Sequence, residues 1–358
     1  MTDEATQVTD SSGVVSLGVD IGIFCSAGVA AVFSIAGCFY IAPYRCCPDW
    51  LCGFCQWRAG MQEFNSLWLV RVSILLTSSV LMISQMLSLS AVWLPNSVIP
   101  LWQIFGVDPT GMEELCRLSL ALSLGVAEPF LLLTTLFACL ASSRRKPCGM
   151  RATSNLQILV LALAATIPVA LMQFTVAFSS AFLPADGMQE DQLLHYLVSV
   201  KQGREDSAIC RADEVGVGGE LGDRRLCISC LYPAASTMVS VFFVFAYLLS
   251  LWSVFDSMAR AVLNRRLRRR LRVLQGLLTA SLILGLALRG VGIVAGPNEV
   301  AFSMIRLCYF LTLLLYVEAI CWTLVWWPIL DARKADWRTE LYWKAEELST
   351  GSFHGDGD

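Results

Sequence analysis

Seven apolar stretches dominate this chain, and each is long enough to cross a lipid bilayer. A transmembrane helix needs roughly 20 consecutive, mainly apolar residues. The stretches that meet this length lie at 14–41, 67–94, 115–141, 155–183, 231–255, 273–295 and 300–327. The sequence therefore predicts an all-α integral membrane protein, a bundle of seven transmembrane helices.

The overall composition agrees with a membrane protein. Hydrophobic residues make up 56% of the 358 residues and charged residues only 15%, with a mean hydropathy of +0.62. Such a chain is too apolar for a soluble domain, and nucleic-acid binding is not expected. Residues 1–13 contain acids but no Lys or Arg, whereas a signal peptide begins with a basic segment. We therefore expect 1–13 to be an outer tail and 14–41 to be a retained span.

Basic residues fall in alternate connections between the spans. The connections at 42–66 and 142–154 are basic, as are the run before the sixth span and the C-terminal tail, whereas 95–114 has no Lys or Arg. Because Lys and Arg of short loops stay in the cytosol, we expect the N-terminus outside and the C-terminus in the cytosol. The long connection at 184–230 has more acids than bases, and we expect it outside.

Four cysteines fall on the predicted outer face, where disulfides persist. They are Cys116 at the outer start of the third span and Cys210, Cys227 and Cys230 in the long outer loop. A bridge from Cys116 would hold this loop over the bundle, and four cysteines allow three connectivities. The alternative is that Cys116 is a small, buried apolar residue, which is a common fate of cysteine.

A second group of cysteines lies in the first predicted cytosolic loop: Cys46, Cys47, Cys52 and Cys55. Juxtamembrane cysteines are typical sites of palmitoylation. The CxxC spacing of Cys52 and Cys55 also fits a zinc site, which the adjacent pair would complete. Free thiols are the third interpretation.

The residues that common membrane enzymes need are missing from the spans. The two histidines, His195 and His354, lie in the outer loop and the tail, so a histidine-bound zinc hydrolase is disfavoured. All four lysines also lie outside the predicted spans, which leaves no site for a retinal Schiff base. We therefore expect no enzymatic activity and no cofactor.

Charged residues inside the spans are candidates for function, because a charge in hydrocarbon is costly and usually faces the bundle interior. Glu128 lies in the third span, Arg289 in the sixth and Glu318 in the seventh, and Asp20 lies in the first. They could contact a ligand or couple to an ion, and Arg289 could pair with Glu318. The alternative is that they only fix helix packing through hydrogen bonds.

An arginine run precedes the sixth span and consists of Arg265, Arg266, Arg268, Arg269, Arg270 and Arg272. Leucines at helical spacing pass through it and predict an amphipathic basic extension of the span. This extension would bind anionic lipids or an acidic cytosolic partner such as a G-protein subunit. After Trp326-Trp327-Pro328, which we expect to end the seventh span, 328–358 is predicted to form a short interfacial helix and a tail.

The seven spans, the cysteine at the top of the third and the basic extension into the sixth together resemble the plan of G-protein-coupled receptors. The third span ends Cys139-Leu-Ala-Ser-Ser-Arg144-Arg145 instead of in an acid-arginine-aromatic triplet, and the seventh lacks the Asn-Pro-x-x-Tyr motif of rhodopsin-like receptors. The run from Cys46 to Trp57 and the acidic outer loop are similar to divergent plant heptahelical proteins described as candidate G-protein-coupled receptors.

The resemblance implies a receptor in the plasma membrane that transmits the binding of an unknown small ligand to a cytosolic partner. A transporter or channel lined by Glu128, Glu318 and Arg289 is a second hypothesis. A scaffold that recruits cytosolic proteins through its arginines and lipidated cysteines is a third.

Overall fold

The computed structural model describes residues 3–41, 67–89, 109–143, 155–179, 200–203, 227–230, 233–261, 265–294 and 300–331. The α-helices are α1 (Asp3–Ile41), α3 (Trp68–Leu87), α6 (Pro109–Ala121), α7 (Glu128–Ser143), α8 (Asn155–Ser179), α10 (Ala234–Ala261), α11 (Arg265–Val294) and α12 (Val300–Cys321). Two π-helices complete the third and seventh spans: η5 (Leu122–Ala127) and η7 (Trp322–Trp326). Strands β1 (Val200–Gly203) and β2 (Cys227–Cys230) pair antiparallel, with Val200 opposite Cys230.

Seven helices are long and apolar enough to cross a membrane, which confirms the predicted architecture. Several of their boundaries differ from the predicted ones. Helix α1 begins at Asp3, so most of the predicted N-terminal tail continues the first helix. Helix α11 begins at Arg265 and carries the arginine run into the sixth span without a break, as the spacing of its leucines predicts.

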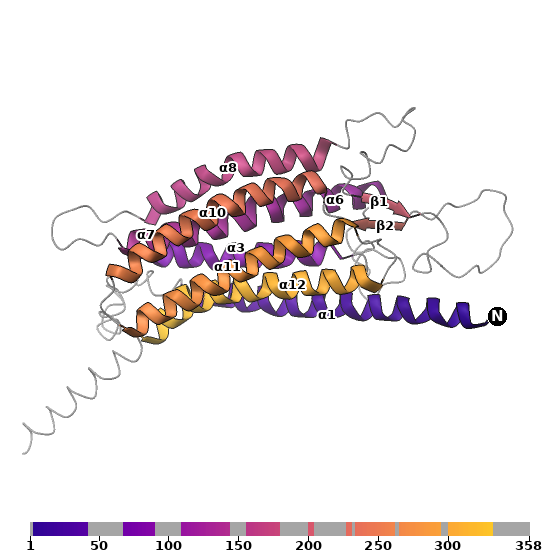
Figure 1. The fold of residues 1–358 in the computed structure, drawn as a ribbon, viewed down its shortest axis with the longest axis horizontal. Helices are drawn as coiled ribbons and strands as arrows, with labels where there is room; N and C mark the ends of the chain where they lie inside the picture. Colours follow the sequence, from indigo (N-terminus) through magenta and orange to yellow (C-terminus); the bar gives the residue numbers. More distant parts are fainter. Residues whose placement is uncertain are drawn as a thin grey trace, which may run out of the picture.

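The seven spans lie alongside one another in a single bundle (Figure 1). Each span packs on the next, and α12 packs back on α1. The hairpin of β1 and β2 lies beside α6 at one end of the bundle, here called the hairpin end. Helix α10 ends and α11 begins at the opposite end, here called the arginine end.

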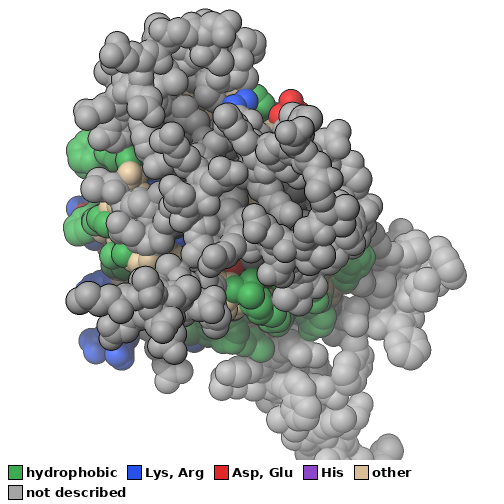
Figure 2. Space-filling model, turned by 90° about the vertical axis from the view of Figure 1, so that its right-hand side faces the viewer, with side chains coloured by type: hydrophobic (Ala, Val, Ile, Leu, Met, Phe, Trp, Pro, Cys, Tyr) green, Lys and Arg blue, Asp and Glu red, His purple; other side chains and the backbone are tan. Residues whose placement is uncertain are grey.

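The third span, built from α6, η5 and α7, is the most enclosed helix of the bundle. In an 18-residue apolar window within Glu114–Leu140, 72% of the residues are buried, compared with 22% in the corresponding windows of the fourth and sixth spans. The other spans expose large apolar side chains on their outer faces, some of which are visible around the hairpin end in Figure 2. Such an apolar exterior around a partly polar interior is expected for a protein surrounded by lipid.

Each π-helix directly precedes a proline. The amide of Glu128 donates to the carbonyl of Ser123, and that of Trp327 donates to the carbonyl of Trp322, so both hydrogen bonds span five residues. Pro129 and Pro328 follow immediately. A proline in an α-helix removes a hydrogen bond and clashes with the carbonyl four residues earlier, and a wider π-turn displaces that carbonyl.

The prediction that the seventh span ends at Trp326-Trp327-Pro328 is therefore wrong, because the helix continues to Asp331. Several other predictions lie outside the described residues: the interfacial helix after residue 331, most of the loop 184–230, and Cys46, Cys47, Cys52 and Cys55. Which end of the bundle faces the cytosol also stays a prediction.

Candidate functional site

A buried ion pair joins the third and sixth spans in the middle of the bundle. The guanidinium Nη2 of Arg289 on α11 lies 2.5 Å from the carboxylate Oε2 of Glu128 on α7. Arg289 is 3% exposed and Glu128 6% exposed. Both charged groups are thus shielded from solvent. In such surroundings a charge is costly unless an opposite charge lies next to it.

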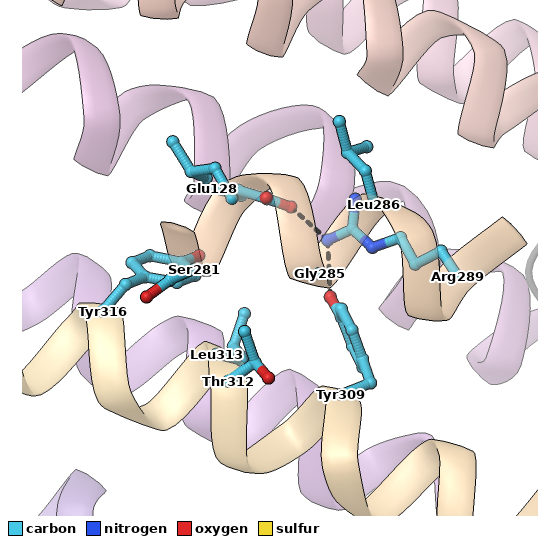
Figure 3. Close-up of a pocket in the computed structure, with 10 residues that line it drawn as sticks. Glu128, Ser281, Gly285, Leu286, Arg289, Tyr309, Thr312, Leu313 and Tyr316 are labelled. Carbon is cyan, nitrogen blue, oxygen red and sulfur yellow. Dashed lines mark hydrogen bonds and ion pairs between the residues drawn. The ribbon is translucent and has the colours of Figure 1, made fainter. Parts of the chain in front are cut away.

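Tyr309 brings the seventh span into the same site. The Arg289 Nη2 also donates to the phenolic oxygen of Tyr309 on α12, at 2.5 Å, and the guanidinium carbon lies 4.9 Å from the centre of the Tyr309 ring. Figure 3 shows the single guanidinium between the carboxylate and the phenol. We call Glu128, Arg289 and Tyr309 the Arg289 network, and it connects three helices through one side chain.

A small polar void adjoins the Arg289 network. Its volume is about 10 Å³, and Ser281, Thr312 and Tyr316 contribute polar groups to its wall. The hydroxyl of Tyr316 is buried and has no hydrogen-bond partner among the described residues. A void of this size has room for about one water molecule.

A second ion pair, which is partly buried, lies closer to the hairpin end. The Arg306 Nη1 on α12 lies 3.6 Å from the Oδ1 of Asp20 on α1, and the Arg306 Nη2 donates to the carbonyl of Ser88 at 2.5 Å. A void of about 30 Å³ separates this pair from the Arg289 network, and Arg289, Tyr309 and Arg306 all contribute to its wall. Buried polar groups thus extend from the first span to the third through two small voids.

Sequence reasoning singled out Asp20, Glu128 and Arg289, and the structure places all three in this buried polar system. It missed Arg306, although Arg306 lies inside the apolar stretch 300–327 and thus meets the criterion that selected the other three, a charged residue within a span. It also missed Gln173 on α8, which donates to the carbonyl of Ser236 on α10 at 3.1 Å and holds the fourth and fifth spans together.

The possible pairing of Arg289 with Glu318 is not found, because Arg289 binds Glu128 instead. Glu318 lies nine residues beyond Tyr309 on the seventh span, which is roughly 13 Å along a helix axis. Its side chain is half-buried and forms no wall of the voids beside Arg289. The structure therefore separates Glu318 from the other two residues of the predicted group.

At the arginine end, the arginine run of α11 divides between different partners. The Arg270 Nη1 lies 2.8 Å from the Oδ2 of Asp331, and its guanidinium covers the Trp327 ring at 4.3 Å. The sixth and seventh spans are thus joined at two levels, by Arg270 here and by Arg289 in the core. Arg268 is half-exposed, and Arg265, Arg269 and Arg272 are exposed. The side chain of Arg266 lies outside the described set.

Cys116 is buried on α6 and is disulfide-bonded. Its partner lies outside the side chains that the structure describes, so the predicted pairings remain open. The backbone of β2, Cys227–Cys230, packs beside α6. Two of the three predicted partners, Cys227 and Cys230, are therefore in a strand that packs on the helix of Cys116.

A family model described as uncharacterised conserved protein UCP031277 matches residues 6–336 of the chain. The chain belongs to this family. The match begins within α1 and ends beyond the last described residue, so it includes all seven spans and every residue of the buried polar system. No curated protein matches the chain.

The Arg289 network leaves little free space around its charged groups. The carboxylate of Glu128 is already bound to a guanidinium, and the adjoining voids hold no more than a few water molecules. Among the described residues, no three of His, Cys, Asp and Glu are grouped so that they could hold a metal ion. The site can hold three helices in one arrangement. It can release them when Arg289 or Glu128 binds a different counter-charge.

Proposed function

We propose that this protein is a receptor-like membrane protein of the plasma membrane, in which an outside signal rearranges the Arg289 network and changes the cytosolic face presented to a partner such as a G-protein subunit. One observation carries the proposal. Helix α11 holds the Arg289 network in the core and continues as a single helix into the arginine run. A change at Arg289 is therefore coupled to the position of the arginine end.

Physical reasons favour two alternative states of the Arg289 network. A buried arginine needs a buried counter-charge. The guanidinium of Arg289 therefore either keeps its present partners or binds other ones, with few intermediate arrangements. The voids next to Arg289 are about 10 and 30 Å³, too small for an organic ligand. A ligand that enters from the hairpin end would therefore separate Tyr309 or Glu128 from Arg289. Such a ligand only has to prefer the rearranged state.

The placement of Glu318 weakens the transporter hypothesis. Glu128 and Arg289 share the wall of one void with each other but not with Glu318 in the described structure. A scaffold, the third hypothesis, needs no buried charges in the core, so the costly Arg289 network would have no purpose in it.

The test is nucleotide exchange on a heterotrimeric G protein, measured with the purified protein in lipid nanodiscs. We expect Glu128→Gln to raise basal exchange severalfold, because it weakens the contact that holds α11 against α7. Leu284→Ala, which changes an exposed side chain of the same helix, is the control and should leave exchange unchanged. If well-folded Glu128→Gln protein gives the same exchange as wild type across a panel of G proteins, coupling of this kind is excluded.

A further inference from the structure

A polar groove lies between α10 and α11 at the arginine end. Its volume is about 660 Å³, and its wall combines arginines with aromatic side chains, among them Arg268, Arg272, Trp252 and Phe255. Neither the Arg289 network nor the contact of Arg270 with Asp331 belongs to this groove. It is large enough to hold a headgroup-sized ligand.

The groove lies at the level where the apolar part of the bundle ends. The apolar fifth span extends to Arg260, and the apolar sixth span starts at Arg268. In a bilayer, this level coincides with the lipid headgroups, where tryptophan is enriched because its ring is apolar and its N–H is polar. Trp252 fits that environment, since it is 58% exposed on the outer face of α10.

The charge of the groove is positive. Arg268 and Arg272 are four residues apart on α11, so they occupy neighbouring turns of one helix face. Among the described residues, the groove wall contains three arginines, Arg260, Arg268 and Arg272, and one acid, Asp256, which Arg260 binds at 2.8 Å. Neighbouring guanidinium groups bind the oxygens of a phosphate well.

An apolar strip leads from the groove along α10. Phe245, Leu249 and Trp252 follow one another at helical spacing, and their exposed fractions are 64%, 61% and 58%. Phe255 is fully buried beneath the groove. A molecule with a phosphate at one end and a long apolar chain at the other could place the phosphate in the groove and the chain along the apolar strip.

We propose that the groove binds the phosphate of an anionic lipid headgroup between Arg268 and Arg272, with an acyl chain along Phe245, Leu249 and Trp252. The site does not depend on the receptor role proposed above. It also assigns different tasks to members of the arginine run: Arg268 and Arg272 hold lipid, while Arg265 and Arg269 do not line the groove.

Native mass spectrometry of the detergent-purified protein tests this site by counting retained lipids. Phosphatidic acid and phosphatidylserine are the probes, and phosphatidylcholine is the zwitterionic reference. We expect tight retention of one anionic lipid, and a roughly thirtyfold weaker affinity in the Arg268→Gln/Arg272→Gln variant, since each arginine at a membrane surface contributes about one factor of five. Arg265→Gln/Arg269→Gln removes the same charge outside the groove and should retain the lipid as wild type does.

Three results would overturn the proposal. Equal weakening in both double variants would mean that lipid is held by overall charge and not by the groove. Phosphatidylcholine carries a phosphate but no net charge. Equal retention of phosphatidylcholine would therefore mean that the groove does not select anionic lipids. Displacement of the lipid by inorganic phosphate at comparable concentration would assign the arginines to a soluble phosphate compound. Because no G protein is present, failure here is distinguishable from failure of the receptor proposal.

Discussion

Arg289 on the sixth span binds Glu128 on the third across a distance of 161 residues in sequence and 2.5 Å in space. Neither residue has access to solvent. The same guanidinium group reaches Tyr309 on the seventh span. A single arginine thereby fixes the relative position of three helices whose other mutual contacts are mainly apolar.

Glu128→Gln and Arg289→Met should each destabilise the folded protein by about 3 kcal/mol, because each leaves one buried charge without its counter-ion. The double variant should recover at least half of that loss, since it removes both charges. Unfolding in mixed micelles, followed by circular dichroism, measures these free energies. Asp256→Asn breaks an exposed ion pair and should change stability by less than about 0.5 kcal/mol. Additive losses in the double variant would contradict a direct pair.

Tyr309→Phe should cost about 2 kcal/mol, because the hydroxyl accepts a hydrogen bond from a buried cation. Tyr316→Phe is the matched control, since its hydroxyl has no partner among the described residues. It should leave stability unchanged to within about 0.5 kcal/mol. The same unfolding measurement compares the two variants. A comparable loss for both would instead indicate a structural water bound to Tyr316 in the adjoining void.

The main elements of the fold could be predicted from sequence, because helix length and apolarity decide what crosses a membrane. The partner of Arg289 could not be predicted. Depth along each helix can be estimated at 1.5 Å per residue, but the rotation of a helix about its axis depends on packing against its neighbours. Glu318 was therefore as plausible a partner as Glu128. The π-helices were also missed, although Pro129 and Pro328 marked both positions.

Gly125→Ala should destabilise the protein by about 2 kcal/mol through overpacking. An added Cβ would lie 3.1 Å from the Cβ of Gln173 and 3.2 Å from the Cα of Ala170, a backbone atom that cannot rotate away. Gly276→Ala has no atom within 4 Å of its added Cβ and lies within α11. This control should be stabilised by roughly 0.5 kcal/mol through helix propensity. A neutral Gly125→Ala would show that α8 and η5 can separate without cost.

Cys116 should be linked to Cys227 or Cys230, because β2, which contains both cysteines, packs on α6. Peptide mapping of non-reduced protein identifies the linked residues. Cys116→Ser should lower stability by about 3 kcal/mol, as expected for a disulfide that closes a long loop. Cys139→Ser, at a buried free cysteine on α7, is a control for loss of a thiol alone. A link from Cys116 to Cys210 would contradict the placement of the strand.

The unbroken course of α11 gives small movements in the core a large effect at its far end. Between Arg289 and Arg268 the helix rises by roughly 30 Å at 1.5 Å per residue. If α11 pivots about Arg289 as a rigid lever, a tilt of about 5° moves the guanidinium of Arg268 by nearly 3 Å over that length. Such a displacement exceeds the tolerance of a hydrogen bond to phosphate. Lipid in the groove would therefore add resistance to that tilt, so the composition of the surrounding membrane would set how easily the helix moves.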